Sequence, residues 1–422
     1  MSSMKIPSSG ELYAQIGALS TKIVERGGTT EKAKALVDAL ATESPDARPQ
    51  IAALIVEYKQ LDGAIQKYNA EHPEAPIQLN EALSTFAAKA LESIVVLDAK
   101  PNNLGKELRA AVLSEVGKAV VGNEKVIELM LIAQLCRGHF LMEGPVGAGK
   151  THLANSFSKV EGLGYKRQQF VSDLLPADVT GTEMENHKTK QWEPKFGAVA
   201  ETDLYHADEL NRAPPKAQGA LLEAMGEGQI TIAGQTRQLS EFFMVMATQN
   251  PEHHAGTFPL TEANKDRFMF KVLLGRPTRE EQAQIMSLQL DGAPKLKQVV
   301  DADKLRAARQ EVQKVLVEKP MREMIIEIVR ATWPGESKIP GVEGKLAGEG
   351  ASERATGAIL QGARAHAFLR GRHYVMPEDV RAVAPYALNH RIEVRPELLA
   401  GRTDPTLEII EAILNHVEQN LS

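Results

Sequence analysis

Apolar residues recur at helical spacing through the first hundred residues of the chain. Proline-rich breaks at 44–50 and 71–76 divide this region into segments. The pattern predicts an all-α N-terminal domain over residues 1–100, either a four-helix bundle or a helical hairpin arm. Its apolar stripes are typical of a core, and it holds no constellation of reactive side chains. In the middle segment, one helical face collects Ile51, Leu54, Ile55, Tyr58, Leu61, Ile65 and Tyr68.

The pattern changes after a turn at residues 99–105. Up to residue 277, short apolar runs alternate with segments of helical periodicity, which is typical of a parallel sheet covered by helices on both faces. We therefore predict an α/β domain over residues 101–277, built on a parallel five-stranded sheet. The strand candidates are the runs 139–143, 168–171, 204–207, 242–248 and 269–274.

From residue 278 to residue 422 the periodicity is helical again, which predicts an all-α C-terminal domain. A glycine-rich stretch, residues 333–352, interrupts this region. We expect it to be a loop rather than a packed element, because glycine and proline punctuate it throughout.

The sequence GPVGAGKT lies between the first strand candidate and a helix candidate. It satisfies the phosphate-binding pattern G-x-x-x-x-G-K-[ST], in which glycines let backbone N–H groups and the helix N-terminus face an anion. Lys150 is expected to reach the β- and γ-phosphates of ATP, and Thr151 to offer its hydroxyl to Mg²⁺. The predicted ATP-binding residues are Gly144, Pro145, Val146, Gly147, Ala148, Gly149, Lys150 and Thr151.

Two other strand candidates end in polar residues. Asp208 and Glu209 follow the run 204–207, and a carboxylate pair at such a position can hold Mg²⁺ and polarise the attacking water. We assign the first role to Asp208 and the second to Glu209. Asn250 follows the run 242–248 and is expected to orient the water or the γ-phosphate. Its strand is expected to lie between the strand that ends at the acidic pair and the strand that precedes the phosphate loop. His206 is interpreted as a buried histidine with a satisfied hydrogen bond.

Composition narrows the classes of function. The chain of 422 residues has a net charge of −6, a pI of about 6.1 and 5% aromatic residues. Neither general attraction to nucleic acid nor a base-stacking platform is indicated. A single cysteine, Cys136, excludes an internal disulfide and fits a reducing compartment. Because the sequence has no signal-peptide pattern and no apolar run near the roughly 20 residues that span a bilayer, we expect a cytoplasmic protein without membrane insertion.

Three stretches, 207–232, 247–268 and 350–392, resemble the MoxR family of AAA+ ATPases, and the similarity extends over close to two-thirds of the chain. The resemblance implies a P-loop AAA+ core followed by a helical lid. It also implies that Arg267 is an arginine finger reaching a neighbouring subunit's ATP and that Arg354 is the sensor-2 arginine, acting on its own site or a neighbour's. Residues 179–200 resemble the insertion within the second helix that marks one clade of AAA+ proteins, and residues 229–239 resemble the hairpin before the sensor strand. The resemblance implies that both project towards the pore of a ring.

By the same resemblance, the protein is expected to be a homo-oligomer, in the form of a hexameric ring, that hydrolyses ATP with Mg²⁺ and acts as a chaperone on a protein client. A separate protein with a von Willebrand factor A domain is the expected partner, and the N-terminal domain is a hypothetical adaptor. Two alternatives stay open. One is a nucleic-acid motor, which the acidic charge and the lack of a recognisable DNA-binding module disfavour, and the other is a nucleotide-switched scaffold with little turnover.

Overall fold

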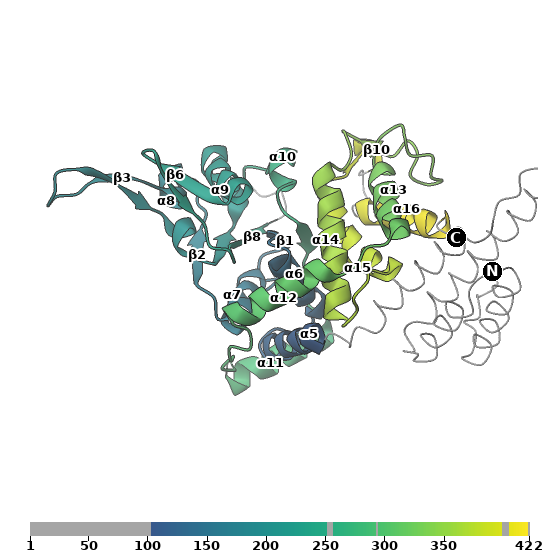
Figure 1. Cartoon of the computed structure of the whole chain (residues 1–422), viewed down its shortest axis with the longest axis horizontal. Helices are drawn as coiled ribbons and strands as arrows, with labels where there is room; N and C mark the ends of the chain where they lie inside the picture. The colour runs from purple at the N-terminus through teal and green to yellow at the C-terminus, as the bar shows by residue number, and fades with distance from the viewer. Residues whose placement is uncertain (1–102, 251–255, 293, 399–404, 421–422) are drawn as a thin grey trace, which may run out of the picture. The chain divides into compact units, whose positions relative to one another are not determined.

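A parallel sheet organises the part of the chain that the computed structural model describes, residues 103–250, 256–292, 294–398 and 405–420 (Figure 1). The predicted all-α domain over residues 1–100 lies outside these ranges. The strand order is β2-β5-β8-β1-β9, and all neighbouring pairs are parallel. The predicted five-stranded parallel sheet is thus confirmed: β1 (Phe140–Glu143), β2 (Tyr165–Gln169), β5 (Leu204–Asp208), β8 (Met244–Gln249) and β9 (Phe270–Leu273). The second strand begins before the predicted run 168–171, because it is a polar edge strand without an apolar pattern.

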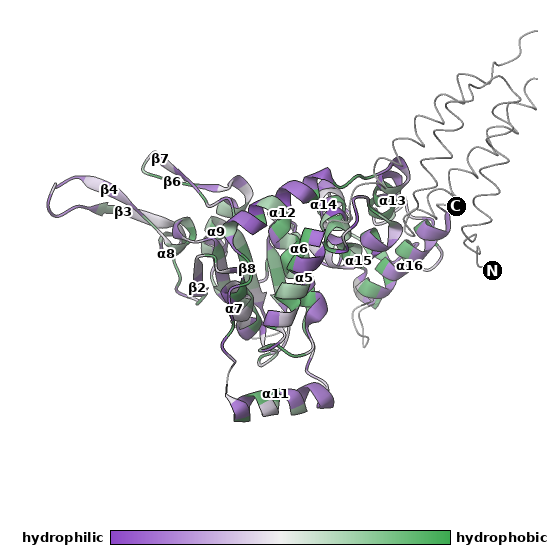
Figure 2. Ribbon diagram, turned by 60° about the horizontal axis from the view of Figure 1, so that its bottom comes forward, coloured by the Kyte–Doolittle hydropathy of each residue, from purple (hydrophilic) through white to green (hydrophobic). Residues whose placement is uncertain are grey.

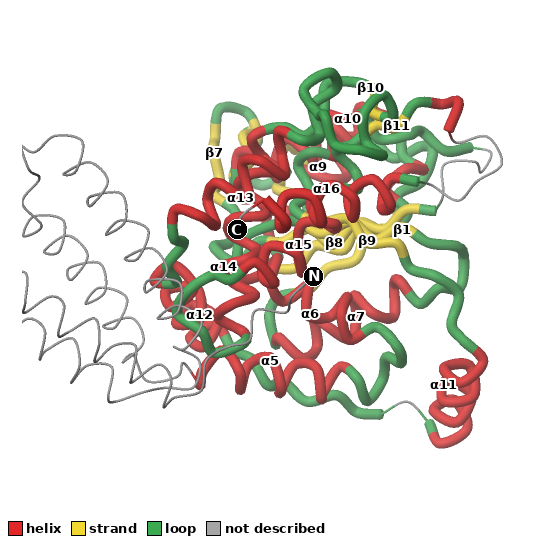
Figure 3. The backbone as a smooth tube through the Cα atoms, turned by 90° about the vertical axis from the view of Figure 1, so that its right-hand side faces the viewer, coloured by secondary structure: helices red, strands yellow, loops and turns green. Residues whose placement is uncertain are grey.

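Alternate residues along the strands point into two hydrophobic cores, one on each face of the sheet. Phe140 and Met142 of β1 belong to one core, whereas Leu141 between them belongs to the other. Helices therefore cover both faces, as predicted (Figure 3). The first core includes residues of α5 (Asn103–Val116), α6 (Glu124–Leu135), α7 (Lys150–Glu161) and α12 (Ala302–Lys314), and the second includes residues of α9 (Pro215–Glu227).

The C-terminal region is a helical bundle, as predicted, with one short two-stranded ladder. Its longest helix, α14, begins after Ser352, whose hydroxyl accepts a hydrogen bond from the backbone N–H of Arg354 at 3.2 Å, as an N-cap residue does. The predicted boundary between residues 277 and 278 stays a prediction. The helices are α13 (Lys319–Arg330), α14 (Glu353–Leu369), α15 (Pro377–Leu388) and α16 (Thr406–Asn420), and the ladder pairs β10 (Leu346–Ala347) with β11 (Glu393–Val394).

The prediction that residues 333–352 form an unpacked loop is wrong. Ile339, Val342 and Leu346 are buried in the same core as the lid helices. The indole N–H of Trp333 donates to the carbonyl oxygen of Ala351 at 2.9 Å. The glycines allow left-handed turns between these anchors, so a segment whose only regular element is the short strand β10 still buries apolar side chains.

Two hairpins project from the same side of the sheet (Figure 2). The turn between β6 and β7 contains Ala233 and Gly234 with φ of +51° and +73°, which is the geometry of a type I′ hairpin turn at the predicted position. The second hairpin lies in the other predicted stretch. The strands are β3 (Gly181–Glu185) with β4 (Trp192–Phe196), and β6 (Gln229–Ile232) with β7 (Gln235–Gln238).

The helix α11 (Arg279–Asp291) lies apart from the sheet and buries none of its residues (Figures 2 and 3). Its start is stabilised by a capping box, in which Thr278 and Glu281 exchange hydrogen bonds of 3.2 and 2.7 Å.

Among the described residues, no helix is long and apolar enough to cross a membrane. The remaining short helices are α8 (Pro176–Thr180), α10 (Glu262–Lys265), η2 (Ala198–Glu201), η3 (Leu210–Arg212) and η4 (Pro396–Leu398).

Replacing Glu161 by Gln is expected to stabilise the fold increasingly as the pH rises. Glu161 ends α7, is fully buried, and neither carboxylate oxygen has a hydrogen-bond partner. Burial raises its pKa to about 8, although Arg309 opposes the shift. The folded chain therefore holds a proton that the unfolded chain loses above about pH 4.3. The free energy of unfolding then falls as pH rises towards 8, by at most about 1.4 kcal/mol per pH unit.

Thermal unfolding between pH 5.5 and pH 8 measures this effect. The exposed residue Glu107 on α5 provides the control substitution Glu107→Gln. If the wild type and Glu161→Gln lose stability in parallel over this range, the assignment of a protonated Glu161 is wrong.

Candidate nucleotide-binding and hydrolysis site

The loop that joins β1 to α7 has the shape of a phosphate cradle. Gly147 and Gly149 have φ of +85° and +81°, and a Cβ atom added to either would meet no atom within 4 Å. These positions favour glycine because of their left-handed backbone, and open space lies in front of them. Gly144 is required for packing instead, since a Cβ there would lie 2.6 Å from the carbonyl oxygen of Leu274.

Lys150 is the first residue of α7 and is 8% exposed. Its Nζ donates to the carbonyl oxygens of Gly144 and Pro145, the latter at 3.1 Å, and to Oδ1 of Asn250 at 3.0 Å. Burial lowers the pKa of Lys150, while nearby carboxylates, Asp208 foremost, oppose the shift. The ammonium group thus lies between the cradle and the end of β8.

Asp208 at the end of β5 lies next to Thr151 of α7. The Thr151 hydroxyl lies 3.2 Å from Oδ2 of Asp208. Oδ2 also accepts two hydrogen bonds from Arg167, at 2.9 and 2.6 Å, and Oδ1 accepts one from Thr248 at 2.5 Å. Burial alone would raise the pKa of Asp208, but His206, Thr248 and Arg167 together lower it well below the ordinary range. Asp208 is therefore an ionised oxygen donor next to a hydroxyl, a combination that suits Mg²⁺.

His206 satisfies the prediction only in part. It is fully buried, and its Nδ1 lies 2.9 Å from the Tyr165 hydroxyl. Its Nε2 has no hydrogen-bond partner and lies 3.6 Å from Oδ1 of Asp208. One ring nitrogen is thus satisfied, and the other faces the predicted metal ligand.

Glu209 is held by side chains from three directions. Its backbone has φ of +57°, a conformation that is uncommon for residues other than glycine and is often found at functional sites. One carboxylate oxygen accepts a hydrogen bond from Nδ2 of Asn250 at 3.3 Å, and the other accepts one from Nε2 of Gln169 at 2.7 Å. The second oxygen also forms an ion pair with Arg212, whose Nε lies 3.0 Å away. Asn250, 3% exposed, therefore links Glu209 to Lys150.

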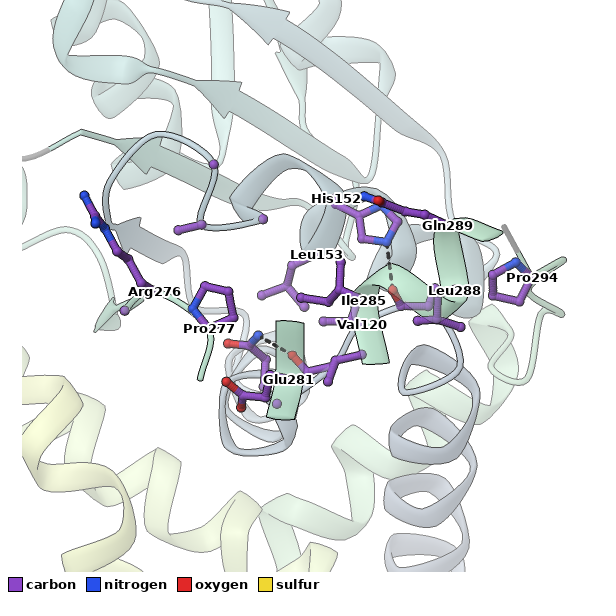
Figure 4. A pocket seen from close by; sticks show the side chains of 18 residues that line it. Val120, His152, Leu153, Arg276, Pro277, Glu281, Ile285, Leu288, Gln289 and Pro294 are labelled. Carbon is purple, nitrogen blue, oxygen red and sulfur yellow. Dashed lines mark hydrogen bonds between the residues drawn. The ribbon is translucent and has the colours of Figure 1, made fainter. Parts of the chain in front are cut away.

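A cavity of about 710 Å³ adjoins the cradle, and neither Asp208 nor Glu209 lines it (Figure 4). Its size is that of a small-molecule site. The connection between α5 and α6, residues 119–123, lines it together with α7, α11 and the cradle glycines. Leu153, Ile285 and Leu288 supply apolar surface, and Nε2 of His152 lies 2.9 Å from the carbonyl oxygen of Ala119. An apolar wall beside a phosphate cradle can accept a nucleotide base.

The two arginines singled out in the sequence do not line this cavity. Arg267 and Arg354 line a second cavity of about 380 Å³ between the sheet domain and the lid. Nη1 of Arg267 donates to the carbonyl oxygen of Leu222 at 2.8 Å. Nη1 of Arg354 lies 3.1 Å from Oδ2 of Asp266, and its side chain is 58% exposed. The structure thus places the two arginines on one shared cavity and not at the cradle.

Sequence reasoning missed two polar residues of the site. Gln169 ends β2 and binds Glu209, and Thr248 lies near the end of β8 and binds Asp208. Both are polar residues near the carboxyl end of a parallel strand, where ligand sites of α/β sheets form. For Thr248 this signal is visible in the sequence, at the end of the predicted run 242–248, whereas Gln169 lies inside the predicted run 168–171 and only the structure shows that it ends β2.

Comparison with known proteins agrees with this geometry. The ATPase family associated with various cellular activities (AAA) matches residues 139–270, and the AAA lid domain matches residues 346–413. The uncharacterised protein YeaC of Bacillus subtilis is 40% identical over 68% of this chain and 87% of its own length. Chaperone MoxR1 of Mycobacterium tuberculosis is 37% identical over 73% of this chain and 80% of its own. A crystal structure of a Cytophaga hutchinsonii protein provisionally described as an ATPase has a TM-score of 0.68 at 37% identity, over 75% of this chain and 96% of the other.

The sheet order, the phosphate loop and the helical lid define a nucleotide-binding ATPase of the AAA+ class. The chain belongs to the MoxR family of AAA+ ATPases.

Proposed function

We propose that the chain forms a ring ATPase that hydrolyses ATP at the contact between neighbouring subunits and uses it to remodel or mature a protein client. The observation that carries this proposal is the separation of the predicted catalytic groups within one chain. Lys150 and Glu209 are linked through Asn250 at the cradle, whereas Arg267 and Arg354 line a different cavity. Positive charge acts on phosphoryl transfer only when it reaches the γ-phosphate. The arginines of one subunit would therefore serve the ATP of the next, which favours action in trans for Arg354 as well.

Within one subunit, we assign the phosphates of ATP to the cradle and to the N-terminus of α7, where backbone N–H groups face an anion. Thr151 and Asp208 would hold Mg²⁺, which when bound neutralises charge on the β- and γ-phosphates. Glu209 would accept a proton from the attacking water. Asn250 and Gln169 hold its carboxylate, so the base is positioned before the substrate arrives.

We propose the client and the assembly by analogy with the family. The relative from Mycobacterium tuberculosis is named a chaperone, which supports a protein client for this chain. We further propose a hexameric ring in the cytoplasm, with both hairpins directed at its pore and a separate partner that carries a von Willebrand factor A domain. We also propose that the chain consists of three domains, with boundaries after residues 100 and 277, and that the N-terminal domain is an adaptor for the client. Size-exclusion chromatography with light scattering, with ATP and purified partner, would contradict it if only monomer eluted.

The specific activity of the ATPase is expected to rise with protein concentration and to require Mg²⁺. A shared site forms only when subunits associate, so dilution should lower the rate per subunit. Chelation should abolish the rate, because it removes the Mg²⁺ that Thr151 and Asp208 would hold. Steady-state phosphate release over a range of subunit concentrations measures both effects. Lys150→Ala, which loses the phosphate-binding ammonium, serves as the background control. A rate per subunit that is independent of concentration would contradict hydrolysis at a shared site, and ATP binding without hydrolysis would favour a nucleotide-switched scaffold.

A further inference from the structure

The cavity that contains Arg267 and Arg354 is also lined by Arg137 and Arg391, and the proposed reaction gives no role to either. Arg391 is the one that contacts the segment of Arg267. Arg391 follows α15 and belongs to the lid. Its side chain is 3% exposed, so it does not present its charge to solvent as Arg354 does. A buried guanidinium needs its donors satisfied, and the partners of this one indicate what it does.

All five N–H donors of Arg391 are used. Nε donates to Oδ1 of Asp266 at 2.6 Å. The two terminal nitrogens donate to four backbone carbonyl oxygens, those of Asp266, Phe268, Met269 and Ala387, at 2.8, 2.7, 3.3 and 2.5 Å respectively. Three of these carbonyls belong to residues 266–269, the short segment that carries Arg267. The lid side chain therefore fixes the backbone on both sides of the proposed arginine finger.

The residues before Arg391 bind the same part of the sheet domain. Nδ2 of Asn389 donates to the carbonyl oxygen of Lys271 at 2.9 Å, and Nε2 of His390 lies 3.0 Å from the carbonyl oxygen of Phe268. Residues 389–391 thus contact the backbone from residue 266 to residue 271. Backbone carbonyls are rigid partners, so these contacts set the path of the segment as well as holding the two domains together.

Asp266 extends this arrangement to Arg354. Its carboxylate accepts from Arg391 and also from the Ser352 hydroxyl, at 2.9 Å to each oxygen, and from Nη1 of Arg354 at 3.1 Å. Ser352 is the N-cap of α14, the helix that carries Arg354. One carboxylate therefore connects the segment of Arg267 to the start of the helix of Arg354.

We propose that Arg391 is a positioning residue for the shared ATPase site. It holds residues 266–269 and the Asp266 carboxylate, and through them it sets Arg267 and Arg354 in the relative arrangement that serves a neighbouring subunit's ATP. The inference rests on the proposed function above. Lysine cannot replace it, because a single ammonium has three donors and lacks the planar fork that reaches five acceptors at once.

Arg391→Lys tests the proposal, with Arg372→Lys as the matched control. Arg372 is another little-exposed lid arginine, 14% exposed, that binds Asp379 with hydrogen bonds of 2.6 and 2.9 Å and does not line the cavity. We expect Arg391→Lys to lower ATP turnover at saturating ATP at least about tenfold, since small displacements of a catalytic group have such effects. Arg372→Lys should change turnover less than about twofold, and neither variant should alter the affinity for ATP, measured with a fluorescent analogue.

Mixing variants gives a readout that a merely structural defect would not produce. Arg391→Lys retains its own cradle and Glu209, so adding Glu209→Gln subunits, whose arginines are intact, should restore part of the turnover. Two results would overturn the inference. One is an equal loss of ATP turnover in Arg391→Lys and Arg372→Lys. The other is that mixing with Glu209→Gln subunits restores turnover to Arg267→Ala but not to Arg391→Lys. Asp266→Asn keeps the shape of the side chain and removes its charge, so it should lower ATP turnover as Arg391→Lys does. If Arg391→Lys does not fold, Asp266→Asn is used in its place.

Failure of this inference differs from failure of the proposed function. If Arg267→Ala keeps wild-type turnover, the shared site itself is wrong and Arg391 has nothing to position. If Arg267→Ala loses turnover while Arg391→Lys and Asp266→Asn keep it, the shared site stands and only the positioning role is wrong.

Discussion

Glu209→Gln is expected to lower ATP turnover by about 10²–10⁴-fold while leaving ATP binding in place, because a positioned general base contributes about that factor. The glutamine amide keeps nearly the same shape as the carboxylate, so the site is not emptied. It cannot accept a proton from water, however, and it loses the ionic part of the contact with Arg212. Single-turnover phosphate release and equilibrium binding of a fluorescent ATP analogue separate the two effects.

The exposed residue Glu223 on α9 supplies the control for this experiment. Glu223→Gln should leave both turnover and binding at the wild-type values. If Glu209→Gln retains more than about a tenth of the wild-type rate, which is far above the loss expected for a general base, another group activates the water. Weaker ATP binding with the same loss of rate would instead indicate damage to the cradle.

Arg267→Ala is expected to lower turnover by about 10³-fold or more, the lower end of the effect of arginine fingers in phosphoryl transfer. Its own cradle is untouched, because Arg267 binds the Leu222 carbonyl and lines the second cavity. ATP affinity should therefore stay within about twofold of wild type. Turnover at saturating ATP and binding of the fluorescent analogue measure the two quantities.

Mixing Arg267→Ala with Glu209→Gln distinguishes a shared site from a self-contained one. Each variant alone is inactive, but a subunit with an intact Glu209 beside one with an intact Arg267 forms a complete site. Random mixing in equal amounts should restore about a quarter of the subunit contacts in a head-to-tail ring. Arg322→Ala, on the exposed face of α13, should behave as wild type. Absence of recovery in the mixture would show that Arg267 does not act on a neighbour.

Much of the site could be predicted from the sequence because its signals are local. The spacing of Gly144, Gly149, Lys150 and Thr151 within eight residues fits the phosphate loop, and the structure places this loop between β1 and α7. Short apolar runs predicted β1, β5, β8 and β9 because side chains buried on both faces of a parallel sheet leave a continuous hydrophobic segment. The edge strand β2, YKRQQ, is polar and was located only in part. The carboxyl ends of such strands lie at one edge of the sheet, which is why Asp208 and Asn250 could be expected near the same ligand.

Tertiary structure alone decided which distant residues meet. Gln169 reaches Glu209 because β2 pairs with β5, and Thr248 reaches Asp208 because β8 lies between β5 and β1. The packing of residues 339–346 against the lid helices was likewise invisible in a segment read only for its glycines.

The sequence by itself determined the phosphate loop, the alternation of strands and helices, and the candidates Asp208, Glu209 and Asn250. The structure decided that Arg267 and Arg354 share a cavity away from the cradle, and that Arg391 fixes the segment between residues 266 and 269. The reason for this difference is the sequence separation of the residues that determine each feature. A turn, a helix cap or a strand depends on residues a few positions apart, whereas a contact between residues 125 positions apart depends on how whole elements pack.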